Sequence, residues 1–121
     1  MKNTQFMKLN KDFKRLYYRG QSIVKSNIVV YVQRNKKGYN LLGLTCGKNI
    51  GKAVKRNRVK RLMRESYRLL ENKINMGYDI VLVARTRSVS CKCIHIYKDM
   101  EQAFTKLGLI KNDEKTSDKI N

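Results

Sequence analysis

The stretch from Gly47 to Leu70, GKNIGKAVKRNRVKRLMRESYRLL, constrains the fold more than any other part of the chain. One set of its side chains is apolar and recurs at the spacing of a single helical face: Val59, Leu62, Met63, Tyr67 and Leu70. A second set is polar or cationic and recurs on the opposite face: Asn57, Arg61, Arg64 and Arg68, with Lys60 on the flank. The pattern predicts a helix with one buried face and one cationic face.

Charge in this stretch is strongly unbalanced. Between Lys48 and Arg68 there is one acid, Glu65, and there are nine basic residues: Lys48, Lys52, Lys55, Arg56, Arg58, Lys60, Arg61, Arg64 and Arg68. Like charges at this density cost stability unless an anion neutralises them, and guanidinium groups suit phosphates. The net charge of +19 for the whole chain has the same implication. We therefore predict nucleic-acid binding, with a plain solvated face as the alternative.

The same stretch resembles the signature of the protein subunit of bacterial ribonuclease P. The family hallmark is Arg-Asn-Arg followed by Lys-Arg, and five residues here match it: Arg56, Asn57, Arg58, Lys60 and Arg61. A weaker resemblance extends from about Phe13 to Leu107.

Composition limits the other classes of protein. A chain of 121 residues is expected to form one domain, which we place at residues 1–110 as a single RNA-binding domain, followed by a disordered tail at 111–121. There is no apolar stretch of 18 residues, so we do not expect membrane binding. The start lacks the apolar segment of a signal peptide, and an odd number of cysteines (three) fits a reducing compartment, so we expect a cytoplasmic protein.

The first half of the chain alternates between the periods of helices and strands. Residues 1–9 are expected to form a flexible basic arm. A helix capped by Asn10 is predicted over Lys11 to Tyr18. Two strands are predicted at Ser22 to Arg34 and at about Tyr39 to Thr45, joined by a turn and paired antiparallel.

The second half predicts a central strand and a last helix. Tyr78 to Ala84 is almost continuously apolar, as in a strand buried on both faces, and should lie parallel to Tyr39–Thr45. Residues Ser88 to His95 have no clear pattern, and a helix is predicted at about Ile96 to Gly108. The expected fold class is α+β, an α/β sandwich whose mostly antiparallel sheet has about four strands, one parallel βαβ crossover and three helices. Crossovers are normally right-handed, but the resemblance implies a left-handed one, in a ribosomal protein S5 domain 2-like fold.

Several kinds of site are disfavoured by spacing. Gly47-Lys48 lacks the following Ser or Thr and the earlier glycine of a P-loop. Cys91, Cys93 and His95, with Cys46 as a fourth ligand, crowd three ligands into five positions, which is not a usual zinc spacing, so we predict no metal site. With one histidine and scattered acids, the chain shows no acid–base pair and no carboxylate cluster for catalysis by the protein itself.

The resemblance supplies a function that needs no catalytic side chain. It implies an endoribonuclease whose RNA subunit, with magnesium ions held by RNA, removes the 5′ leader of precursor tRNA. The protein would bind the catalytic RNA and the leader so that cleavage proceeds at physiological magnesium. No cofactor bound by the protein and no protein partner are implied.

The resemblance also assigns site residues. The RNA contacts are expected from Lys48, Lys52, Arg56, Asn57, Arg58, Lys60, Arg61, Arg64 and Arg68. A groove for the single-stranded leader is expected at Phe13, Tyr17 and Tyr31, since aromatic faces stack unpaired bases without requiring a sequence. From the residues alone, such side chains are more often core than binding site.

Two features depart from the family pattern. Gly47-Lys48-Asn49 stands where Ser-Lys-Lys is usual, and an arginine common near Leu41-Leu42 is missing.

Two alternative functions are also open, a structural RNA-binding protein of the ribosomal type and a DNA-binding protein.

Overall fold

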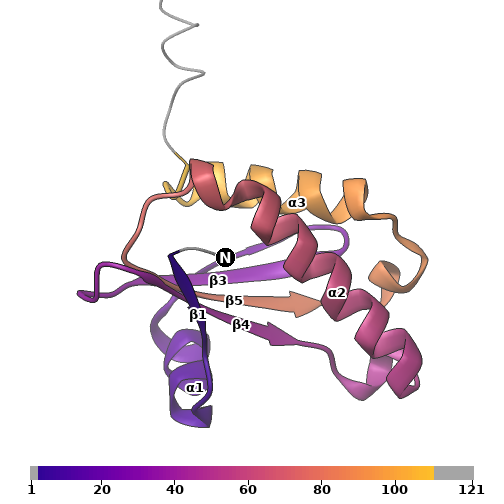
Figure 1. Ribbon diagram of the computed structural model, residues 1–121. Helices are drawn as coiled ribbons and strands as arrows, with labels where there is room; N and C mark the ends of the chain where they lie inside the picture. The colour runs from indigo at the N-terminus through magenta and orange to yellow at the C-terminus, as the bar shows by residue number, and fades with distance from the viewer. Residues whose placement is uncertain (1–2, 111–121) are drawn as a thin grey trace, which may run out of the picture.

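The centre of the computed structural model, which describes residues 3–110, is one five-stranded sheet with the order β1-β4-β5-β3-β2. Helices α2 and α3 cover one face of the sheet, and α1 lies against the other (Figure 1). The strands are β1 (Thr4–Phe6), β2 (Gln21–Val24), β3 (Ile28–Arg34), β4 (Asn40–Thr45) and β5 (Tyr78–Ala84). The helices are α1 (Asn10–Arg19), α2 (Ala53–Leu70) and α3 (Cys93–Lys106), with short 3₁₀ turns η1 (Lys48–Ile50), η2 (Glu71–Lys73) and η3 (Thr86–Ser90).

Strand β5 lies in the middle of the sheet, as its apolar sequence predicts. It pairs parallel with β4 and antiparallel with β3, and α2 joins β4 to β5 as the predicted parallel crossover, which is left-handed (Figure 1). The predicted pairing of β3 with β4 is wrong, because β5 is inserted between them. A strand that is buried on both faces is most stable with a neighbouring strand on each edge, because both sets of its backbone groups are then hydrogen-bonded.

Residues 3–7 do not belong to a flexible arm, which was predicted at residues 1–9. Strand β1 pairs parallel with β4, and the amide of Met7, whose side chain is buried, donates to the carbonyl of Leu42 at 2.9 Å. The predicted strand Ser22–Arg34 is divided by a turn into the antiparallel hairpin β2–β3. The sheet therefore has five strands and two parallel pairs, where about four strands and one parallel pair were predicted.

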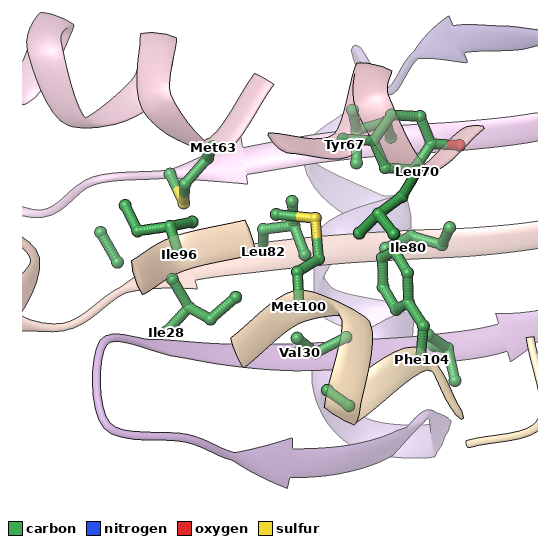
Figure 2. Packing of buried hydrophobic residues seen from close by; sticks show 14 of the residues in the cluster. Ile28, Val30, Met63, Tyr67, Leu70, Ile80, Leu82, Ile96, Met100 and Phe104 are labelled. Atoms are coloured by element: carbon green, nitrogen blue, oxygen red, sulfur yellow. The ribbon is translucent and has the colours of Figure 1, made fainter. Parts of the chain in front are cut away.

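The main core lies between the sheet and helices α2 and α3. The apolar stripe predicted on α2 is confirmed, since four of its five members are buried and Leu62 is half-buried. Figure 2 shows Met63, Tyr67 and Leu70 of α2 meeting side chains of α3 above the sheet. The α3 residues in this core are Ile96, Met100, Ala103 and Phe104. Helix α3 starts three residues before the predicted Ile96, within the segment that had no clear pattern.

A smaller core holds α1 against the opposite face of the sheet. Leu16 of α1 packs there with Met7 and with side chains of β4 and β5. Arg15 also joins the helix to the sheet, because its guanidinium bonds Asp12 at 2.8 Å and the buried carboxylate of Asp79 at 2.6 Å. The predicted cap is wrong, because Asn10 is the first helical residue and Leu9 precedes it without a side-chain cap. The predicted disordered tail, 111–121, lies outside the described residues.

Candidate nucleic-acid interface

The exposed face of α2 carries the predicted ladder of Asn57, Arg61, Arg64 and Arg68. The apolar stripe packs on the sheet, so the helical period directs these side chains to solvent. Within residues 3–110, Arg61 and Arg64 have no hydrogen bond or ion pair to another side chain. Two guanidinium groups are therefore available to an external anion.

The last member of the ladder, Arg68, has a partner on its own helix. Its guanidinium pairs with Glu65 one turn earlier, and this hydrogen bond lowers the pKa of the Glu65 carboxyl below its usual range. Both side chains are exposed, and such pairs contribute little to stability. A phosphate therefore has to compete with Glu65 for Arg68, whereas Arg61 and Arg64 are unengaged.

Arg58, an expected RNA contact, is directed into the protein. Its Nη1 donates to the carbonyl of Val89 at 3.0 Å and its Nη2 to the carbonyl of Cys91 at 2.8 Å. These bonds hold the connection between β5 and α3 against α2, since they satisfy two carbonyls that no helix or strand pairs. Arg58 is thus primarily a structural residue of this surface.

Arg56 and Lys60 lie on a different flank of α2, next to Cys46 at the end of β4. Burial raises the pKa of the Cys46 thiol, and the positive charges of Lys60 and Arg56 oppose that rise. Within the described chain neither cation has an acidic partner within ion-pairing distance. The cationic surface of α2 therefore extends around the helix to the end of the sheet.

The approach to α2 supplies Lys48 in η1 and Lys52 directly before the helix, both exposed. Between them, Gly51 has a φ angle of +128°, a backbone conformation that residues other than glycine rarely adopt. Asn49, where the family usually has a lysine, donates to the hydroxyl of Thr86 at 3.3 Å. The position that departs from the family pattern thus links η1 to η3.

Two further cations, Arg85 and Arg87, lie on either side of the residue that makes this link, and neither was predicted as a site residue. They flank Thr86 and are exposed, and Arg85 is oriented by a 2.6 Å hydrogen bond to the carbonyl of Lys25. The sequence contains only the short run ARTR as a signal, and the run lies far from the basic helix along the chain. The contact between η1 and η3 places it beside the start of α2.

The three expected groove aromatics come together on the α1 side of the sheet. The rings of Tyr17 and Tyr31 meet edge to face, with centroids 5.0 Å apart, and Phe13 packs beside them over Gly43. Tyr17 is 42% exposed, and its hydroxyl lies 3.2 Å from that of Thr45. The rings are therefore partly in the small core and partly open to solvent.

The aromatic cluster and the cationic flank approach the end of β4 from opposite faces of the sheet. Thr45 contacts Tyr17 of the cluster, and the next residue, Cys46, lies beside the charges of Lys60 and Arg56. The ladder itself lies across the sheet, because α1 and α2 cover opposite faces (Figure 1). The aromatic faces and the cations thus lie on opposite sides of the sheet near the end of β4.

One thiol and several acids of the described residues make bonds that hold the fold together. Cys91 is buried, and its thiol donates to the side-chain carbonyl of Asn27 at 2.9 Å. The acids bond neighbouring elements, as Asp79 does with Arg15 and Asp99 with the backbone amide of Asn27. Among residues 3–110 no three His, Cys, Asp or Glu side chains are grouped so as to hold a metal ion.

Comparison with known proteins decides the family. The family model described as Ribonuclease P matches residues 1–108, almost the entire described chain. The chain belongs to the ribonuclease P protein family. Its relatives include the ribonuclease P protein components of Alkaliphilus metalliredigens, 41% identical over 107 residues (88% of this chain and 93% of that one), and of Clostridium botulinum strain Loch Maree, 43% identical over 108 residues (88% and 93%).

Solved structures of ribonuclease P proteins have the same fold. The protein from Staphylococcus aureus superposes with a TM-score of 0.78 at 30% identity, over 88% of this chain and 97% of that one. The protein from Thermotoga maritima gives 0.73 at 26% identity, over 81% and 93%. The predicted fold class and the family resemblance are both confirmed. Across the part of the chain that the structure describes, no helix has the length and apolarity needed to span a bilayer.

Proposed function

We propose that this chain is the protein subunit of a ribonuclease P holoenzyme and binds both the catalytic RNA and the leader of precursor tRNA. The proposal rests on one observation above all: in a chain of this family, an aromatic cluster open to solvent lies on one face of the sheet, and the exposed cations of α2 lie on the other. Unpaired bases stack on aromatic faces for about 1–3 kcal/mol each, and nearby cations hold the phosphates.

The two surfaces have different tasks. The leader occupies the groove of Phe13, Tyr17 and Tyr31, where stacking tolerates leaders of different sequence. The catalytic RNA binds the exposed side of α2, principally through Arg61 and Arg64, with Lys48 and Lys52 beside them. Arg56 and Lys60, on the flank of α2 near Cys46, screen the repulsion of one RNA by the other.

The hydrolytic step belongs to the RNA subunit. Magnesium ions held by RNA supply the activated water, and the protein adds fixed positive charge where two polyanions approach each other. This explains why the holoenzyme would work at a magnesium concentration too low for the RNA subunit alone.

Cleavage of precursor tRNA by a bacterial ribonuclease P RNA at low magnesium tests the proposal. We expect the protein to stimulate cleavage, and the double substitution Arg61→Gln with Arg64→Gln to remove most of the stimulation without changing the melting temperature. The matched control, Lys98→Gln with Lys106→Gln on α3, removes the same charge from exposed positions and should retain stimulation. A protein that binds RNA but never stimulates cleavage, even with the RNA of its own species, would instead be a structural RNA-binding protein of the ribosomal type.

A second experiment separates the leader groove from the α2 surface. Tyr17→Ala removes the most exposed ring of the aromatic cluster, so it should weaken holoenzyme binding of precursor tRNA by about fivefold or more. Binding of mature tRNA, which has no leader, should be unchanged. Equal weakening for both ligands in a folded variant would exclude the leader from this groove.

A further inference from the structure

Helix α1 has a second side, which faces away from the sheet and carries its own aromatic side chain. Tyr18 is 92% exposed, the highest value among the large hydrophobic residues that are exposed. Lys11 and Lys14 precede it by seven and four residues, so the three side chains lie along one helical face. Phe13, Leu16 and Tyr17 point the other way, into the small core and toward Tyr31.

The cations around Tyr18 are not neutralised by the protein. The acid on this helix, Asp12, bonds Arg15, which also bonds Asp79 of the sheet. Within residues 3–110, Lys11, Lys14 and Arg19 have no acidic partner. Together with Arg15 and Tyr18 they line a shallow depression of about 520 Å³. An exposed ring among unpaired cations is the arrangement that binds unpaired nucleotides in single-stranded RNA.

We propose that this outer face of α1 binds the upstream part of a long leader, beyond the nucleotides that lie in the groove. A base stacks on Tyr18, and phosphates on either side contact Lys11, Lys14 and Arg19. The inference rests on the proposed function, because the leader reaches this face only if it first occupies the groove on the inner side of the same helix.

Two observations favour the leader over the catalytic RNA as the occupant. Tyr17 of the groove and Tyr18 are consecutive residues on a ten-residue helix, so a strand leaving the groove needs only to pass around α1. Helix α1 and the ladder of α2 lie on opposite faces of the sheet (Figure 1), so an RNA docked on α2 lies on the other side of the molecule. A base-paired RNA segment would not bind Tyr18 in this way, because its bases are already stacked on one another.

The test compares holoenzyme binding of two precursor tRNAs, one whose leader ends within the groove and one whose leader is extended by unpaired adenosines. The extension should tighten binding to the wild-type holoenzyme. Tyr18→Ala should lower the affinity for the long leader about fivefold and leave the affinity for the short leader unchanged. Tyr18→Phe retains the ring and should behave as wild type.

The charged residues have a separate readout. Lys11→Gln with Lys14→Gln should reduce the dependence of log affinity on log salt concentration by about 1.4 for the long leader, since each phosphate contact on a single strand contributes about 0.7. The α3 control, Lys98→Gln with Lys106→Gln, should leave the slope unchanged. Tyr18, Lys11 and Lys14 are exposed and without polar partners in the described chain, so the melting temperature should stay constant.

Three results would overturn the inference. Tyr18→Ala could leave long-leader binding unchanged, it could weaken both leaders equally, or the extension could add no affinity in the wild type. Equal weakening would assign the outer face to the catalytic RNA. Failure of the proposed function is recognised separately, because then Tyr17→Ala would not affect the short leader either.

Discussion

The ring of Phe13 occupies the space that a side chain on Gly43 would need. A Cβ added at Gly43 would lie 2.5 Å from Cε1 and 2.7 Å from Cζ of that ring, which is closer than van der Waals contact allows. Glycine in β4 thus lets the ring of Phe13 in α1 lie close to the sheet, where it forms one wall of the proposed leader groove.

Gly43→Ala should therefore displace the Phe13 ring and destabilise the fold by about 1–3 kcal/mol, the usual range for overpacking. Leader-dependent binding should weaken with it. A double-mutant cycle with Phe13→Ala isolates the cause, because without the ring the added methyl group has room and should cost little. Equal costs in both backgrounds, measured by chemical denaturation, would show that the Phe13 contact is irrelevant.

Arg58 and Arg61 should respond differently to substitution although both belong to the predicted RNA contacts. Arg58→Ala leaves the carbonyls of Val89 and Cys91 without their donor, so it should lower the free energy of unfolding by about 1.5–3 kcal/mol. Arg61→Ala should leave stability within about 0.5 kcal/mol, since it is an exposed substitution, and should reduce the salt dependence of RNA binding. Thermal denaturation and binding titrations at several salt concentrations check this pair. The interpretation fails if Arg58→Ala is as stable as the wild type.

Tyr67 should make stability depend on alkaline pH. Its buried hydroxyl lies 2.8 Å from the hydroxyl of Thr4 and accepts a 3.1 Å hydrogen bond from the side chain of Asn40. Burial raises the pKa of Tyr67, so above pH of about 10 the unfolded state loses this proton before the folded state does. The contribution of the hydroxyl is therefore complete below that pH and is lost as the pH rises.

Tyr67→Phe measures this contribution. It should cost about 1–3 kcal/mol at neutral pH, because Asn40 and Thr4 lose a buried partner, and the difference from the wild type should shrink above pH of about 10. The exposed Tyr18→Phe serves as the control for loss of a tyrosine hydroxyl and should leave the free energy of unfolding at neutral pH within about 0.5 kcal/mol of the wild type. A constant difference across the pH range would mean that Tyr67 does not titrate as its burial implies.

Cys46 should report on RNA bound at the adjacent cations. Burial raises the pKa of its thiol and the charges of Lys60 and Arg56 oppose this, so phosphates that neutralise the two cations should raise the pKa further. The thiolate is the reactive form, and alkylation of Cys46 should therefore slow when RNA binds. Cys93, which lies on α3 next to Ser66, provides the internal control in mass-spectrometric mapping. Unchanged alkylation of Cys46 at saturating RNA would place the RNA elsewhere.

The periodic elements were predictable because their signals are local. The two faces of α2 follow from residue spacing alone, and so does the central position of β5, because a continuously apolar strand has to be covered on both sides. The expected gathering of Phe13, Tyr17 and Tyr31 came from the family resemblance, and the edge-to-face contact of the two tyrosines agrees with it. Their contacts with RNA remain predictions.

By itself, then, the sequence determined the amphipathic helices, the central strand and the surplus of cations, since each depends on residues close together in the chain. Tertiary structure decided the pairing of β5 between β3 and β4, the addition of β1 to the sheet, the inward turn of Arg58 and the contact between η1 and η3. These features depend on backbone groups and side chains that are distant in sequence. Which of them meet is decided by the packing of the whole sheet and not by any local period.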